Sequence, residues 1–201
     1  MKKLGIMGGT FNPPHFGHFS IAQQSIAQLG LSKVLFIPTG RITYKEADDI
    51  VSGRDRYNML KLVVDENRDF ELSDIEISDS GVTYTVNTLE RLKNGSCSGW
   101  ELYFLVGADS LDYMEKWREP QRIFGLCTVA VVGRAQIPER QLCEKIKNLK
   151  QQYDAEIVRV EMPIVDVSST LLRSNIKQNK PIRYMTDDKI IEYINNHSLY
   201  K

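Results

Sequence analysis

Residues 3–18 read KLGIMGGTFNPPHFGH, a short apolar segment followed at once by a turn rich in glycine, proline and histidine. The apolar residues 3–7 are typical of a buried parallel strand. Gly17 falls in the expected first turn of a helix, where glycine costs about 1 kcal/mol relative to alanine. Residues so unfavourable for regular structure gather where a ligand or an unusual turn requires them. We therefore expect a ligand-binding turn over residues 8–18.

The residues after this turn complete a strand–helix–strand unit. Residues 16–29 place apolar side chains at helical spacing before Gly30, and residues 33–38 form a second apolar run that stops at Pro38. The alternation continues with helices expected over 54–65, 83–95, 138–153, 168–179 and 187–197, and strands over 70–77, 101–107, 127–133 and 156–160. It predicts a single α/β domain over residues 1–201, with a doubly wound, mostly parallel sheet and a small helical C-terminal part at about 168–201.

The charge balance excludes a large electrostatic field. The 201 residues include 26 Lys and Arg against 26 Asp and Glu, so we expect no nucleic-acid or membrane partner. No apolar stretch approaches the roughly 18 residues of a membrane span. The three cysteines form no CxxC pair and the first residues do not resemble a secretory signal, so a reducing cytoplasm is expected. A homo-oligomer remains open.

The turn over residues 8–18 does not fit the common nucleotide or metal motifs. Its glycines do not follow GxGxxG, and no GxxxxGK[ST] loop occurs. His15 and His18 are three residues apart without a glutamate or an evident third ligand, so no metal held by protein side chains is expected.

Phosphate binding at a helix N-terminus remains. Amides and dipole there favour an anion by roughly 0.3–1 kcal/mol. Gly8 and Gly9 would let the backbone approach a polyphosphate, and Gly17 would remove a side chain facing the ligand. His15 and His18 would add donors on one face. The alternative is that one histidine merely starts the helix.

Two signatures, separated by most of the chain, identify a family resemblance. GGTFNPPHFGH (8–18) resembles the GxFxPxHxGH signature of the nucleotidylyltransferase superfamily, and SSTLLR (168–173) resembles its second signature, SSTxxR. Residues 82–93, 104–119, 131–134 and 190–200 look like the corresponding segments of bacterial nicotinate mononucleotide adenylyltransferases. The resemblance implies a Rossmann-like nucleotidylyltransferase fold. It also implies transfer of AMP from ATP to nicotinate mononucleotide, which gives deamido-NAD and pyrophosphate in NAD biosynthesis.

The resemblance carries residue roles with it. It implies that His18 contacts the α-phosphate, that His15 helps to hold the phosphates and that Arg173 reaches the departing pyrophosphate; these three are the expected catalytic residues. The expected ATP- and phosphate-binding residues are Gly8, Gly9, Thr10, Phe11, Lys45, Gly107, Asp109, Arg134, Ser168, Ser169 and Thr170. The expected pyridine-nucleotide-binding residues are Thr85, Trp117 and Arg118, with main-chain amides near the last two. Mg²⁺ is expected with ATP, held mostly by the triphosphate.

Several of these residues have structural alternatives. The hydroxyls of Ser168–Thr170 suit a helix N-cap, as does Asp109. Arg173 could be a solvated arginine and Trp117 a core residue. Lys45 follows Ile-Thr-Tyr where relatives often carry Pro-Pro-His, and residue 12 is Asn where aspartate is frequent.

Other functions also remain open at this point. The rivals are a phosphopantetheine adenylyltransferase, a cytidylyltransferase, or a nucleotide sensor without turnover.

Overall fold

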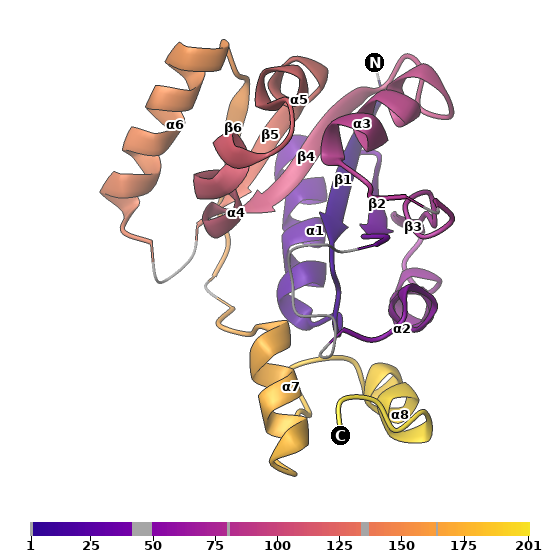
Figure 1. The fold of residues 1–201 in the computed structure, drawn as a ribbon. Coiled ribbons are helices and arrows are strands. Elements are labelled where there is room, and N and C mark those ends of the chain that lie inside the picture. Colours follow the sequence, from indigo (N-terminus) through magenta and orange to yellow (C-terminus); the bar gives the residue numbers. More distant parts are fainter. Residues whose placement is uncertain (1, 42–49, 80, 134–136, 164) are drawn as a thin grey trace. The chain divides into compact units, whose positions relative to one another are not determined.

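Strands and helices alternate along the chain, as the sequence predicts (Figure 1). The computed structural model describes residues 2–41, 50–79, 81–133, 137–163 and 165–201. The strands are β1 (Lys3–Gly9), β2 (Lys33–Pro38), β3 (Phe70–Leu72), β4 (Glu101–Gly107), β5 (Thr128–Val132) and β6 (Ile157–Val160). The helices are α1 (Phe16–Leu29), α2 (Gly53–Val64), α3 (Thr85–Asn94), α4 (Ala108–Tyr113), α5 (Pro120–Leu126), α6 (Glu139–Tyr153), α7 (Ser169–Lys177) and α8 (Asp188–Asn196), with a 3₁₀ turn η2 at Met114–Lys116.

The strands form one six-stranded sheet in the order β3-β2-β1-β4-β5-β6. β1 pairs in parallel with β4, with Lys3 opposite Glu101, and β4 and β5 continue the parallel pairing out to β6. This is the strand order of doubly wound dinucleotide-binding folds, in which the winding reverses between the first and fourth strands. The expected α/β class is confirmed. In such sheets ligands bind beyond the carboxyl ends of the strands at the reversal, and β1 ends where the glycine- and proline-rich turn begins.

The chain divides into two compact units. The first comprises Met1–Met7, Ile21–Val34 and Tyr84–Ile164, and the second comprises Gly8–Ser20, Leu35–Thr83 and Val165–Lys201. In the first unit the apolar run of β5 is fully buried, as expected of a central parallel strand. Leu89 of α3, Ile123 of α5 and Leu149 of α6 are also completely buried.

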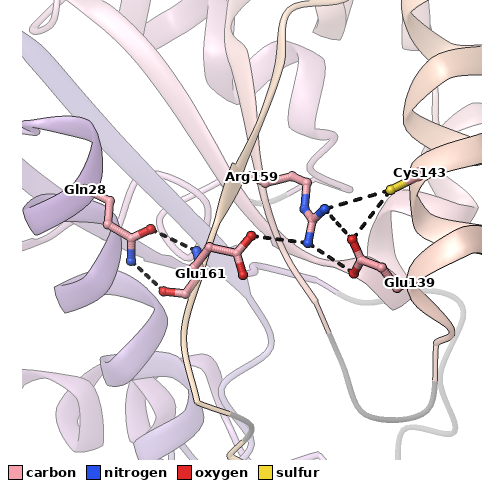
Figure 2. Close-up of polar contacts among 5 residues, drawn as sticks. All are labelled: Gln28, Glu139, Cys143, Arg159 and Glu161. Carbon is pink, nitrogen blue, oxygen red and sulfur yellow. Dashed lines mark hydrogen bonds and ion pairs between the residues drawn. The ribbon is translucent and has the colours of Figure 1, made fainter.

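A polar network joins α6, β6 and α1 in the first unit (Figure 2). Arg159 of β6 pairs with Glu139 at the start of α6 and with Glu161 at 3.2 Å. Gln28 of α1 then donates to the Glu161 carbonyl oxygen at 2.5 Å and accepts from its N–H at 2.9 Å. Glu139 raises the pKa of Arg159. Because most of these groups are exposed, the network contributes little stability.

The second unit has its own core. Phe36 of β2, Met59 and Leu60 of α2, Leu172 of α7 and Ile190 of α8 are fully buried. Side-chain hydrogen bonds also join α2 to α8, because Tyr193 donates to Asp55 at 2.9 Å and accepts from Asn58 at 3.1 Å. The closing helices therefore pack as part of this unit.

The structure differs from the sequence expectations in two places. The extended segment expected over 70–77 stops at Leu72, because Ser73 accepts from the N–H of Ile75 and a turn closes from Asp74 to Ser78. The helical turns of Ala108–Leu126 were not expected, because α4, η2 and α5 are too short to display a helical period. Among the described residues, no helix is long and apolar enough to cross a membrane.

Candidate phosphate-binding site

The turn that follows β1 is built around the side chain of Phe11. Phe11 has a left-handed backbone (φ 51°) and is 1% exposed. Its ring packs edge-on against the His18 ring, with centroids 4.8 Å apart, and lies under Gly9, where a Cβ would be 3.2 Å from it. A ligand could therefore meet only the main chain of Phe11. The side chain supports the turn from the core.

His15 and His18 lie together in the first turn of α1. Their ring centroids are 3.8 Å apart, and the main-chain N–H of His15 donates to Nδ1 of His18 at 3.2 Å. A neutral imidazole that accepts at Nδ1 carries its proton on Nε2. His18 is therefore held as an Nε2–H donor. His15 is 4% exposed, whereas His18 is partly exposed, so His18 is the more accessible of the two.

Gly17 serves the histidine pair, which differs from the expectation that it faces a ligand. A Cβ at residue 17 would lie 3.0 Å from both Cε1 and Nδ1 of His15. At that distance the buried His15 ring would have to shift by a few tenths of an ångström to admit a Cβ. The His15 ring therefore occupies the space that a side chain at residue 17 would fill.

The main chain of the turn is held at Asn12, Pro13 and Pro14 by side chains from the C-terminal part of the chain. Arg173 Nη1 donates to the Asn12 carbonyl oxygen at 2.9 Å and Ser169 Oγ donates to that of Pro13 at 2.8 Å. Thr186 Oγ1 donates to that of Pro14, also at 2.8 Å. Buried carbonyl groups need such donors. The structure thus brings the two signature segments, 8–18 and 168–173, into direct contact.

Ser168 caps α7, so the capping alternative is confirmed for this serine. Its Oγ accepts from the N–H of Leu171 at 3.2 Å. The Ser168 and Thr170 side chains are exposed at the start of this nine-residue helix. Arg173 is only partly exposed, and its Nε is buried without a hydrogen-bond partner among the described residues. The N-terminal half of α7, which contacts the turn over residues 8–18, thus presents hydroxyls, amides and a guanidinium, all suited to binding an anion.

Arg56 of α2 also holds the turn, and sequence patterns did not single it out. It is 2% exposed and donates to the carbonyl oxygens of Thr10 at 2.9 Å, Val51 at 3.3 Å and Gly40 at 3.4 Å. Burial lowers the pKa of its guanidinium. The group nevertheless stays charged at neutral pH, because the ordinary pKa of arginine is far above 7. A buried charge satisfied by main-chain oxygens indicates a positioning role. Helical patterning alone gave no signal for it.

The expected nucleotide residues of the first unit follow β4. Gly107 ends the strand and is the N-cap of α4, so the structural alternative that Asp109 is the N-cap is wrong. Asp109 is exposed in the first turn of that helix.

The expected pyridine-binding residues lie in the first unit too. The guanidinium of Arg118 stands 4.7 Å from the ring centroid of Tyr84, beside Thr85 at the start of α3. Trp117 is half-buried and packs edge-on against Phe104. Its main-chain N–H donates to Met114, so this amide is not a ready donor for a pyridine carboxylate.

Two expected residues, Lys45 and Arg134, lie outside the described residues. Within the described ranges, no three His, Cys, Asp or Glu side chains gather in a way that could hold a metal ion.

Comparisons with known proteins show the family to which the chain belongs. A family model with the description "Cytidylyltransferase-like" matches residues 6–175. A protein named "Probable nicotinate-nucleotide adenylyltransferase" from Lachnoclostridium phytofermentans is 36% identical over 200 residues, 100% of both chains. One of the same name from Caldicellulosiruptor bescii is 37% identical over 202 residues, covering 99% of each chain.

A solved structure shares the fold. The nicotinic acid mononucleotide adenylyltransferase of Plasmodium falciparum, complexed with NaAD, superimposes with a TM-score of 0.81 at 19% identity, covering 100% of this chain and 98% of that one. The chain therefore belongs to the cytidylyltransferase-like family and, within it, to the nicotinate-nucleotide adenylyltransferases.

Proposed function

We propose that this protein transfers the adenylyl group of ATP to nicotinate mononucleotide, forming deamido-NAD and pyrophosphate. The observation that carries the proposal is the contact between the two signature segments. Ser169 and Arg173, from the first and second turns of α7, donate to the carbonyl oxygens of Pro13 and Asn12, in the turn that leads into His15 and His18. The relatives from Lachnoclostridium phytofermentans and Caldicellulosiruptor bescii are named for this activity, and this chain matches at least 99% of the length of each.

The reaction asks for positioning and positive charge. A phosphate oxygen of the mononucleotide attacks the α-phosphorus of ATP, and the bond from that phosphorus to the oxygen bridging to the β-phosphate breaks. The electron pair leaves with pyrophosphate. Because the nucleophile is already an anion at neutral pH, no general base is required. Such transfers depend on in-line placement and on stabilising charge at the equatorial oxygens.

The residues of the turn and of α7 suit these two demands. His18, as an Nε2–H donor, would meet the α-phosphate where negative charge accumulates. Arg173, together with the hydroxyls and amides of Ser168, Ser169 and Thr170, would receive the β- and γ-phosphates that depart. His15 would act chiefly by orienting His18. Gly8, Gly9, Thr10 and the main chain of Phe11 would complete the phosphate cradle.

The remaining expected residues keep their proposed roles. Asp109 would bind a ribose hydroxyl near Gly107, and Lys45 and Arg134 would contact the nucleotide. Thr85, Trp117 and Arg118 would bind the pyridine nucleotide.

Mg²⁺ would enter with ATP, bound mainly by phosphate oxygens, and would neutralise part of the triphosphate charge. The protein would act in the cytoplasm as a single domain, with a homo-oligomer left open.

Pyrophosphate release tests the proposal. The purified full-length chain is given ATP with nicotinate mononucleotide, nicotinamide mononucleotide or phosphopantetheine, and release is followed by a coupled enzyme assay. We expect the highest kcat/KM with nicotinate mononucleotide. Release only with phosphopantetheine would assign the rival enzyme instead, and binding of ATP without release from any pair would assign a sensor.

A further inference from the structure

The far end of the chain reaches the phosphate turn. Tyr200, the penultimate residue, is 9% exposed, and its hydroxyl donates to Asn12 Oδ1 at 2.8 Å. The N–H of Val51 donates to the same oxygen at 3.2 Å. Asn12 is itself 3% exposed, and its main-chain oxygen is the acceptor for Arg173. Asn12 therefore links the tyrosine hydroxyl to the guanidinium expected at the departing pyrophosphate.

We propose that Tyr200 is a positioning residue for adenylyl transfer, acting through Asn12 on Arg173 and on the turn that carries the two histidines. The proposal rests on the proposed function. It assigns a catalytic purpose to the C-terminal segment after α8, which touches the turn from a sequence distance of 188 residues.

The closing segment is shaped to deliver this hydroxyl. After α8 the chain turns back with left-handed residues at Ser198 (φ 51°) and Tyr200 (φ 63°), and the N–H of Leu199 donates to the carbonyl oxygen of Ile194 at 3.0 Å. Left-handed non-glycine residues are uncommon and require support from their surroundings. The hydrogen bond to Asn12 supplies such support for Tyr200.

The surroundings keep the Tyr200 hydroxyl a donor. Burial raises its pKa, and the nearby charges of Arg173 and Arg56 oppose that rise only in part. The phenol therefore holds its proton throughout the neutral range. Arg56 donates a hydrogen bond to the Thr10 carbonyl oxygen. The turn is thus held at Thr10 by Arg56 and at Asn12 by Tyr200, on either side of Phe11.

Removing only the hydroxyl should loosen the turn without unfolding the protein. In Tyr200→Phe the ring still fills its place, but Asn12 Oδ1 loses the shorter of its two hydrogen bonds and keeps the one from the N–H of Val51, so the amide is held less firmly. A displacement near 1 Å at a positioning residue can lower a rate by about 10²-fold. We expect kcat to fall about tenfold or more in Tyr200→Phe, with KM for ATP changed much less.

Tyr193→Phe is the matched control. Tyr193 is another tyrosine of the C-terminal segment, partly buried where Tyr200 is buried, and its hydroxyl donates to Asp55 and accepts from Asn58. Loss of the Tyr193 hydroxyl should lower the melting temperature by as much as Tyr200→Phe does, a few degrees for a chain of this size. Its kcat should stay within about twofold of wild type, the scatter of independent sites.

The experiment measures kcat, KM for ATP and melting temperature for the wild type and both variants, in the pyrophosphate-release assay with nicotinate mononucleotide. Tyr200→Phe is then repeated in an Asn12→Leu background, which has no acceptor. Because residue 12 then has no side-chain acceptor for the tyrosine hydroxyl, Tyr200→Phe should change kcat by about twofold or less in that background.

Three outcomes would overturn the inference. If the wild type is active and Tyr200→Phe has the same kcat, the inference fails and the proposed function stands. The same holds if Tyr200→Phe and Tyr193→Phe lose kcat equally. A wild type that releases no pyrophosphate would overturn the proposed function and the inference together.

Discussion

The main-chain N–H of His15 donates to Nδ1 of His18, and the two rings lie 3.8 Å apart. One histidine thereby fixes the tautomer and the direction of the other. The pair is asymmetric: His15 is buried against Gly17 and His18 is the more accessible. Substitutions at the two positions should therefore affect different properties of the protein.

His18→Ala should lower kcat for pyrophosphate release by about 10²–10³-fold, the usual loss for a preorganised donor to a developing oxyanion. The protein should still fold, with a melting temperature a few degrees lower, because the His15 N–H loses its acceptor and Phe11 loses a ring contact. His197→Ala is the control, since His197 is exposed on the turn after α8 and should leave kcat unaltered. An unchanged turnover number in His18→Ala would remove His18 from the proposed mechanism.

Gly17→Ala should destabilise the fold. The new Cβ would press on the His15 ring at 3.0 Å, and overpacking of this kind typically costs about 1–3 kcal/mol. Gly125→Ala in α5 is the opposite case, because nothing lies within 4 Å of the position that its Cβ would take. Alanine there should raise the free energy of unfolding by about 0.5–1 kcal/mol. Urea unfolding of both variants measures the free energies. Equal stabilities would show that the His15 ring yields without cost.

Arg173→Lys should impair catalysis although the charge is retained. A lysine could bond to the Asn12 carbonyl or to a phosphate, but it lacks the fork that serves both. We expect kcat/KM for ATP to fall by at least about tenfold, in line with the loss of a charge-assisted bond. Arg183→Lys, at an exposed arginine paired with Asp188, should be neutral in the same steady-state assay. If the two variants behave alike, Arg173 is a structural residue.

Arg56→Met should unfold the protein more easily. It strips a donor from the carbonyl oxygens of Thr10, Gly40 and Val51, and each buried acceptor left unsatisfied costs about 1–3 kcal/mol. Arg54→Met, on the exposed side of the same helix, should stay within about 0.5 kcal/mol of wild type. Chemical denaturation distinguishes them, and matching midpoints would contradict the role given to Arg56.

Stability should fall at alkaline pH partly because of Tyr200. Its pKa is higher in the folded chain than when unfolded, mainly through burial, with Asp55 adding to the shift and Arg173 and Arg56 opposing it. The unfolded chain therefore releases this proton first, near pH 10, and stability is lost as the pH rises beyond that value. Unfolding free energies measured from pH 8 to 11 should decline less steeply for Tyr200→Phe. An identical decline would mean that the phenol is not protected by the fold.

Much of the fold was predictable because its signals are local. Residues 16–29, 33–38 and 101–107 form the elements that their apolar patterns predict, at the same boundaries. Short elements such as α4 and α5 were missed, because they contain too few turns for a period to emerge.

For the site, the sequence indicated which segments matter but not how they are supported. The phosphate turn and the start of α7 were both expected, and hydrogen bonds join them. Asn12, Arg56 and Tyr200 support the turn through contacts that depend on tertiary structure. A lone buried arginine has no distinctive sequence pattern. Residues 190–200 resemble a family segment, but the resemblance does not show that Tyr200 bonds to Asn12.

The most direct test of the proposed mechanism is a crystal structure of the full chain with a non-hydrolysable ATP analogue. We expect His18 Nε2 to lie within hydrogen-bonding distance of the α-phosphate, while Arg173 and the first residues of α7 contact the β- and γ-phosphates of the same molecule. A nucleotide bound with its phosphates away from either His18 or α7 would contradict this mechanism.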